Sequence, residues 1–320
     1  MSRKFWIDTD MGSDDAVALI MVLQDKTVDV VGISTLSGNV PLQQASLNAR
    51  FVAELCDSAV PVYAGAGKPL LRPYVDATWF HGADGLSGYG GQPLQLPEKQ
   101  HGVDALIQAT KEYDDLVLVT LGPLTNIALA VARDPRIVSR ISRCVVMGGA
   151  ACTYGNVTPA AEYNIWVDPD AARMVFLSGM PVEMVGWEFC QGEFALDEAE
   201  MAHVRNLDTN LADFTLNSNE VAIKAYYEQT GHHGLSLPDP VTMAVALDKS
   251  IAVDMSKHYV EIETQSDLTR GITLVDKLNV AEDPRNCDTW AQAIKAGKNV
   301  AVTWAIDSQG WKQALYNSLI

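Results

Sequence analysis

The strongest constraint on the fold of this chain is a repeated alternation of strand-like and helix-like segments. "KFWID" precedes a helical stretch around "DDAVALIMVLQ", and "VDVVGIST" precedes another around "QQASLNARFVAELC". The alternation resumes with "LVLVTL", "LTNIALAVAR" and "ISRCVVMG". The strand-like runs are rich in β-branched residues and lack period-two polarity, which is typical of strands buried on both faces. The sequence therefore predicts an α/β protein with an open, mostly parallel sheet and helices on both faces, as in Rossmann-like folds.

The rest of the chain is compatible with one domain spanning residues 1–320. It shows no internal repeat, low-complexity segment or linker, and its 48% hydrophobic composition can fill a sizeable core. Residues 197–250 are expected to be mostly helical around the polar loop "TGHHGLSLPDP". A hairpin-like pair ("HYVEIET", "GITLVD"), a final strand ("VAVTWAI") and a last helix complete the expected order.

The charge of the chain narrows the classes of partner. It has 23 Lys and Arg against 40 Asp and Glu, a net charge of −17. Such a surface repels phosphate backbones and anionic headgroups, so we expect neither nucleic acid nor membrane as a partner. The five scattered cysteines form no CxxC pair, and we see no signal peptide or membrane-length apolar run. We therefore expect a cytoplasmic protein with a small-molecule or metal ligand.

Chemically interesting residues follow several of the expected strands. Asp8 and Asp10 end the first strand, Asn39 follows the second, and "LGPLTN" and "MGGA" end two later ones. Ligands of open parallel sheets bind beyond the carboxyl ends of the strands. The sequence therefore predicts a site at this edge of the sheet.

Four aspartates crowd the stretch "WIDTDMGSDDA": Asp8, Asp10, Asp14 and Asp15. An EF-hand loop starting at Asp8 would require Gly and Glu where this chain has Ser13 and Leu19, so that type of calcium loop is excluded. A phosphatase of the haloacid dehalogenase type uses an Asp-x-Asp pair after a strand, but gives no role to Asp14 and Asp15. A helix cap explains one aspartate and not four.

A divalent cation explains the cluster better. The helix that begins near Asp14 would add the positive end of its dipole to the site. A cation of the calcium type takes six to eight oxygen ligands, so a further carboxylate must come from elsewhere. Asp239, which lies between two prolines at an expected helix start, is the candidate.

Six motifs, in order and spacing, resemble those of the inosine-uridine preferring nucleoside hydrolases. They are "DTDMGSDDA", "HGADGL", "LGPLTNIA", "GNVTPAAEYNIWVDPDAA", "DPVTMA" and "ETQSDLTRGITLVD". The resemblance covers essentially the whole chain. It implies the nucleoside hydrolase core fold and calcium-dependent hydrolysis of the N-glycosidic bond of ribonucleosides to nucleobase and ribose, as in purine and pyrimidine salvage. It also implies a homo-oligomer, either a dimer or a tetramer.

The resemblance further implies roles for individual residues. Ca²⁺ would be bound by Asp10, Asp15, Asp239 and the backbone carbonyl of Leu121, where relatives often have Thr. Asp10, beside the metal-held water, is the implied general base, with Asp8 orienting its neighbours. The implied ribose contacts are Asp14, for the 2′-hydroxyl, and Asn39, Asn156, Glu162 and Asn164. Glu162 and Asn164 would project to the same side of an extended segment. His81 is the implied catalytic residue near the nucleobase.

The sequence departs from the family pattern at the leaving group. Many relatives have a histidine directly before the late aspartate, whereas this chain has Pro238, which cannot transfer a proton. The residues that could compensate are His232 or His233, Tyr226 or Tyr227, and Trp79 through stacking on the base. The preferred base therefore stays open. The alternative function is a catalytically weak, calcium-dependent nucleoside- or ribose-binding protein of the same fold.

Overall fold

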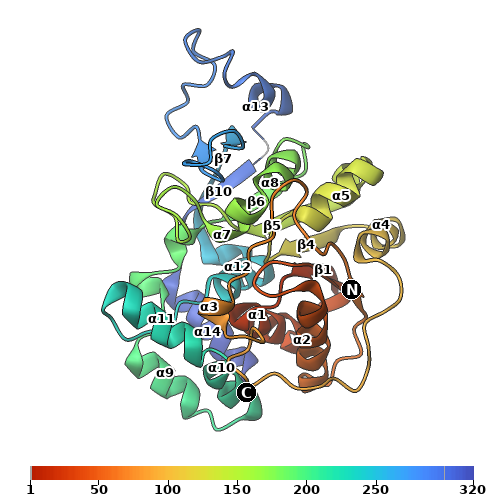
Figure 1. Cartoon of the computed structure of the whole chain (residues 1–320), viewed down its shortest axis with the longest axis vertical. Coiled ribbons are helices and arrows are strands. Elements are labelled where there is room, and N and C mark those ends of the chain that lie inside the picture. The colour runs from red at the N-terminus through yellow and green to blue at the C-terminus, as the bar shows by residue number, and fades with distance from the viewer. Residues whose placement is uncertain (1, 299) are drawn as a thin grey trace.

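The fold centres on one eight-stranded sheet, seen in a computed structural model that describes residues 2–298 and 300–320. Its strand order is β3-β2-β1-β4-β5-β6-β10-β7 (Figure 1). Neighbouring strands are parallel except β10 and β7, which pair antiparallel. The strands are β1 (Arg3–Thr9), β2 (Val28–Thr35), β3 (Val62–Ala64), β4 (Leu116–Thr120), β5 (Ile141–Met147), β6 (Val182–Val185), β7 (Ala252–His258) and β10 (Val300–Ile306). A separate antiparallel pair joins β8 (Val260–Ile262) to β9 (Thr273–Val275).

Helices cover both faces of the sheet. One layer contains α1 (Ser13–Gln24), α2 (Leu42–Leu55), α10 (Asn210–Asn217), α12 (Pro238–Leu247) and α14 (Ser308–Ser318). The other contains α4 (Gly102–Glu112), α5 (Thr125–Arg133), α6 (Ile137–Arg140) and α8 (Pro169–Phe176). The remaining helices are α3 (Thr78–His81), α7 (Tyr163–Val167), α9 (Glu198–Arg205), α11 (Glu220–Thr230), α13 (Ala291–Ala296) and short 3₁₀ turns at Trp187–Phe189, Gly192–Phe194 and Lys249–Ile251.

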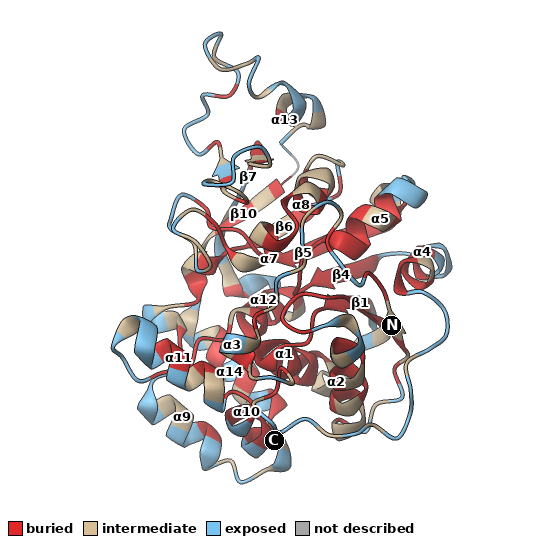
Figure 2. Ribbon diagram, viewed as in Figure 1, coloured by how far each residue is buried: buried red, intermediate tan, exposed pale blue. Residues whose placement is uncertain are grey.

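The strands are apolar on both faces, which explains why the sequence lacks polar alternation. In β1, Phe5 and Ile7 enter the core under α1 and α12, while Trp6 enters the core under α4 and α5. In β4, Val117 enters the same core as Phe5 and Ile7, and Leu118 enters the same core as Trp6. Figure 2 shows the consequence, with the central strands and α1 buried and the outer helix faces exposed. The expected sheet with helices on both faces is therefore confirmed, and so is the late hairpin.

The sequence did not predict where the final strand lies. β10 inserts between β6 and β7, so residues at the end of the chain complete the sheet beside a strand more than a hundred positions earlier. The segment between β9 and β10, which includes α13, projects from the top of the view in Figure 1.

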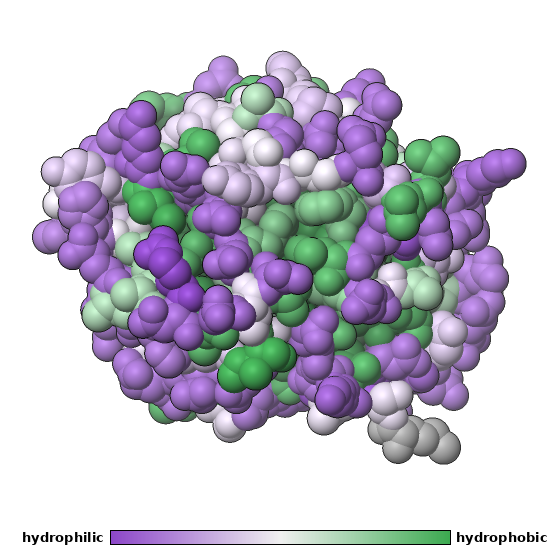
Figure 3. Space-filling model, turned by 90° about the horizontal axis from the view of Figure 1, so that it is seen from below, coloured by the Kyte–Doolittle hydropathy of each residue, from purple (hydrophilic) through white to green (hydrophobic). Residues whose placement is uncertain are grey.

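The surface is mixed in polarity. Seen from below, apolar side chains gather in a central hollow with hydrophilic side chains around it (Figure 3). All five cysteines are free. Among the described residues, every helix is too short or too polar to cross a membrane.

Candidate active site

A cavity of about 650 Å³ opens where the carboxyl ends of the strands meet. Nine of the residues expected from the sequence line it: Asp14, Asn39, Trp79, His81, Leu121, Asn156, Glu162, Asn164 and Asp239. They come from segments that follow β1, β2, β3, β4 and β5 and from the start of α12. The edge expected from the strand pattern is thus where the cavity lies.

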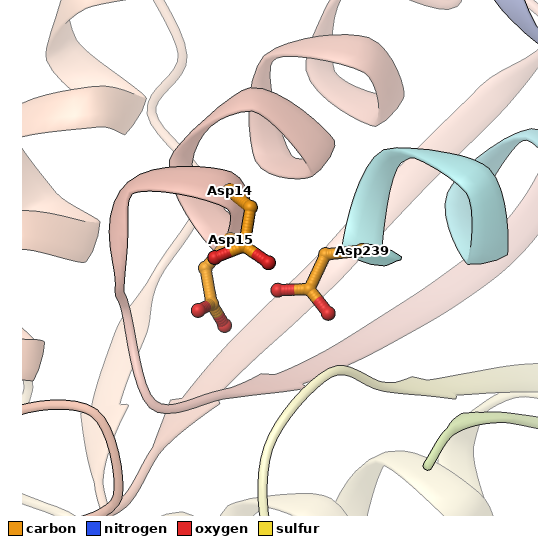
Figure 4. A group of neighbouring side chains, drawn as sticks. All are labelled: Asp14, Asp15 and Asp239. Carbon is orange, nitrogen blue, oxygen red and sulfur yellow. The ribbon is translucent and has the colours of Figure 1, made fainter. Parts of the chain in front are cut away.

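Three buried carboxylates converge beside this cavity. Asp14, Asp15 and Asp239 present oxygens that all lie within 4.8 Å of one another. Figure 4 shows the first two in the first turn of α1 and the third in the first turn of α12, with their carboxylates turned towards one another. Both helices therefore direct the positive end of their dipoles at the cluster, which favours negative charge there.

Asp10 lies next to this group without being part of it. Its carboxylate accepts hydrogen bonds from the backbone N–H of Asn39 at 2.6 Å and from the Asn39 side chain at 3.3 Å. The same side-chain amide donates to Asp15 at 3.0 Å, so Asn39 links the two acids. Asp10 is also tightly enclosed, because a Cβ at Gly38 would lie 1.9 Å from its oxygen. Glycine is required there for the loop after β2 to pass so close.

Burial dominates the electrostatics of the cluster. It raises the pKa of Asp14 and of Asp15 to about 6, and for Asp15 the charge of Asp14 adds to the effect. Burial and neighbouring carboxylates also raise the pKa of Asp10 and Asp239 well above the usual range. Across the described part of the chain, no Lys or Arg forms an ion pair with any of these four acids.

This arrangement fits a divalent cation. One oxygen of Asp14 is buried without a hydrogen-bond partner among the described residues. Like charges at such short separation in a buried site are costly unless protons or a metal neutralise them. All the side-chain donors are carboxylates, the ligand type that hard cations prefer. Fold and site together thus define an α/β protein with a buried acidic centre suited to a metal ion.

Asp8 is fully buried at the end of β1, away from the cavity lining. One of its oxygens accepts hydrogen bonds from Ser34 and Asn126, and its other oxygen has no partner among the described residues. Burial raises the pKa of Asp8 to about 7. Asp8 thus ties β1 to β2 and α5 directly under the site.

His81 lies at the end of α3 against the start of α1. Its Nδ1 accepts a hydrogen bond from the backbone N–H of Ser13 at 3.2 Å, and burial lowers its pKa to about 4. The ring is therefore neutral at pH 7 and carries its proton on Nε2. Its 3.7 Å approach to Asp14 is consequently not an ion pair at that pH.

The expected ribose-binding residues lie together, although their local structure differs from the expectation. Glu162 is the N-cap of α7 and accepts hydrogen bonds from the backbone of Asn164 at 2.8 Å and Gly149 at 2.9 Å. The extended segment expected through Asn164 is therefore wrong, because α7 begins at Tyr163. Burial raises the pKa of Glu162 to about 7. The Asn164 amide donates to the Leu121 carbonyl at 2.8 Å, which fixes both groups on the cavity wall.

Asn156 is held in the loop before α7. Its side-chain oxygen accepts a hydrogen bond from the backbone N–H of Tyr163 at 2.8 Å. Its side chain thereby reaches the cavity beside Val157 and Glu162.

The aromatic residues expected to contact the base agree less well with the structure. Trp79 lines it and stays 60% exposed, whereas Tyr226 and Tyr227 do not line it. Tyr227 stacks on His233 instead, with ring centroids 4.3 Å apart. Gln229, from the same helix α11, does line the cavity.

Several other lining residues were absent from the sequence expectations, among them Trp187 and Gln229. Trp187 directly follows the loop after β6, so the rule that ligands bind beyond carboxyl ends could have identified it. No sequence signal marks Gln229.

Comparisons with known proteins identify the family of this chain. The family model of the inosine-uridine preferring nucleoside hydrolases matches residues 5–312. The chain is 36% identical over 323 residues to the pyrimidine-specific ribonucleoside hydrolase RihA of Shewanella sp. (strain MR-4), covering 100% of this chain and 96% of the relative. It is 33% identical over 286 residues to the pyrimidine-specific ribonucleoside hydrolase RihB of Escherichia coli (strain SE11), covering 89% and 90%.

Solved structures agree on the fold. A plant nucleoside hydrolase, PpNRh1, superposes with a TM-score of 0.91 at 29% identity, covering 100% of this chain and 99% of the other. A purine-preferring ribonucleoside hydrolase from Gardnerella vaginalis superposes with a TM-score of 0.86 at 28% identity, covering 99% and 98%. The chain belongs to the inosine-uridine preferring nucleoside hydrolase family. It is thus a hydrolase that acts on N-glycosyl bonds.

Proposed function

We propose that this protein hydrolyses pyrimidine ribonucleosides to free base and ribose with Ca²⁺ as cofactor. The observation that carries the proposal is the meeting of a buried carboxylate cluster and the Asn39, Glu162 and Asn164 side chains in one cavity. A ribose offers several hydroxyl groups to such carboxylates and amides. The acidic cluster then lies where the sugar, rather than the base, would be bound.

Asp10, Asp15, Asp239 and the Leu121 carbonyl would hold the cation. When bound, it supplies positive charge that neutralises these acids and orients hydroxyl groups. Asp10 takes a proton from the attacking water as the water oxygen bonds to C1′. Asp14 accepts from the 2′-hydroxyl, while Asn39, Asn156, Glu162 and Asn164 hold the other hydroxyls. These contacts position C1′ while positive charge develops on the sugar.

Two observations favour pyrimidine substrates. The relatives that cover this chain at 33% and 36% identity are named pyrimidine-specific. At Pro238 this chain also lacks a group that could protonate a departing purine. His81, neutral with its proton on Nε2, serves as a hydrogen-bond donor rather than a strong acid.

A panel of ribonucleosides tests the function. The chelator-treated protein is given Ca²⁺ or Mg²⁺ and then uridine, cytidine, inosine or adenosine, and free ribose is measured. We expect ribose from uridine and cytidine in Ca²⁺ and little after chelation. 2′-Deoxyuridine is the matched control, because it lacks the hydroxyl assigned to Asp14. Calcium-dependent nucleoside binding without ribose release would instead establish the alternative of a binding protein.

A further inference from the structure

One segment next to the cavity has almost no backbone hydrogen bonds. Residues 71–76 contain neither helix nor strand, and three of the six are exposed. The neighbours of the segment, Leu70 and Ala77, each have a hydrogen-bonded backbone N–H. Among the described residues, the backbone of 71–76 makes a single hydrogen bond, which the Val75 carbonyl accepts from the Tyr163 hydroxyl at 2.9 Å.

Tyr163 connects this segment to the cavity wall that carries Glu162 and Asn164. It is the first residue of α7, and its side chain lines the cavity. Its backbone N–H donates to the Asn156 side chain at 2.8 Å, so the residue is held at its backbone while its hydroxyl reaches Val75. The contact therefore joins two parts of the site that lie 88 positions apart in the chain.

The side chains of the segment make other contacts, none of them with α7. Arg72 donates to Asp170 at 3.4 Å, and the Tyr74 hydroxyl donates to the Gly38 carbonyl at 3.1 Å. An exposed segment with few backbone hydrogen bonds opens at a low cost in free energy. Loss of the Tyr163 contact should therefore change the position of the segment measurably.

We propose that Tyr163 is a positioning residue, whose hydroxyl holds the 71–76 segment so that the residues directly after it form the wall that contacts the nucleobase. These residues are Ala77, Trp79 and Phe80, all of which line the cavity. The two aromatic rings offer the flat, apolar surface on which a nucleobase packs. The proposal rests on the proposed function, because it takes the sugar to lie at the acids and amides described above and the base beside this wall.

The role concerns substrate binding and not the chemical step. His81, at the other end of α3, is fixed separately by the hydrogen bond from the backbone N–H of Ser13. The bond from Tyr163 to Val75 is already present without substrate. An interaction that is equally strong with bound substrate and in the transition state affects KM and leaves kcat unchanged.

The test compares Tyr163→Phe with Tyr154→Phe, both with Ca²⁺ present. The first variant keeps the ring in the cavity wall and removes only the hydroxyl. Tyr154 is exposed in the loop before α7, lies outside the cavity lining and donates to Gln191 at 2.9 Å, so its variant removes a similar hydrogen bond nearby. The measurements are kcat and KM for uridine, inhibition by ribose, and hydrogen exchange of the Ala77 amide, which donates to the Asn39 carbonyl.

We expect Tyr163→Phe to raise KM for uridine about threefold to tenfold, the effect of one lost hydrogen bond, and to change kcat by less than about twofold. The inhibition constant of ribose, which carries no base, should change by less than about twofold, and exchange at Ala77 should be at least about threefold faster. An unchanged KM, an equal weakening of uridine and ribose, unchanged exchange at Ala77, or the same changes in Tyr154→Phe would overturn the proposal. Wild-type turnover of uridine decides the proposed function separately, and exchange at Ala77 reports on Tyr163 even in a protein without turnover.

Discussion

Neutralising one acid of the cluster should stabilise the metal-free protein while removing its response to calcium. In Asp239→Asn, an amide replaces a carboxylate whose oxygens lie within 4.8 Å of those of Asp14 and Asp15. Asn is close to Asp in shape and can donate its amide N–H to the Asp15 carboxylate. The variant therefore replaces a buried repulsion with a hydrogen bond.

The size of the effect follows from Coulomb's law. Two charges 4.8 Å apart, at an effective dielectric constant of ~20, repel by about 3 kcal/mol. A chain of 320 residues unfolds with an entropy of about 0.7 kcal/mol/K, so this energy corresponds to an increase in Tm of roughly 4–5 °C. The free energy of unfolding in chelator should rise by a similar amount in Asp239→Asn.

The effect should also depend on pH in a defined direction. The pKa of Asp239 is raised in the folded protein, and that of Asp14 and Asp15 lies at about 6 instead of 3.8. Protonated forms of these acids therefore favour folding, and this stability is lost as pH rises from about 4 through 6. In chelator, the wild type should lose Tm over this range, and the advantage of Asp239→Asn should grow with pH.

Thermal unfolding with chelator and with Ca²⁺, at pH 5 and pH 7.5, measures the Tm difference between the variant and the wild type, its pH dependence and the response to Ca²⁺. Asp288→Asn makes the same chemical change at an exposed position and is the control. At pH 7.5 we expect Ca²⁺ to raise the Tm of the wild type and of the control, and to leave Asp239→Asn unchanged. A variant that is less stable than wild type in chelator, or that still responds to Ca²⁺, would refute the reasoning.

Three further substitutions test single roles. Asp10→Ala should lower kcat by about 10²–10⁴-fold, the contribution of a general base, and wild-type kcat would contradict that assignment. Pro238→His should raise inosine turnover relative to uridine, and an unchanged ratio would show that this position does not govern the leaving group. His81→Asn should lower kcat/KM about tenfold without changing the pH profile between 5 and 8, since His81 has a pKa of about 4 and is already neutral there. Loss of an ionisation from that profile would contradict the neutral-donor role.

Local sequence patterns could predict the layers of the fold and the edge that carries the site. Apolar residues on both faces of a strand, such as Phe5 and Trp6, indicate a sheet covered on both sides. The same patterns do not encode which strands pair. The position of β10 between β6 and β7 depends on contacts between distant segments, which periodicity does not contain.

In the site, too, local sequence patterns predict some residues, whereas others depend on contacts between distant segments. Asp14 and Asp15 could be assigned because they follow the first strand directly, and Asp239 because prolines mark a helix start. The face that α11 turns to the cavity could not be inferred. Each helical residue rotates the side-chain direction by about 100°, so Gln229 lines the cavity while Tyr227 points elsewhere. The sequence predicted an extended segment through Glu162 and Asn164. It could not predict that Glu162 caps α7, because the position of that short helix depends on tertiary contacts.

The central claim is that Asp10, Asp15 and Asp239, distant in sequence, share one calcium ion. A crystal of the protein grown with Ca²⁺ and a nucleoside analogue, measured for anomalous scattering, tests it most directly. The account predicts one anomalous peak in contact with oxygens of all three carboxylates and with hydroxyl groups of the sugar. An ordered sugar in the cavity with no such peak, or a peak that excludes Asp239, would contradict it.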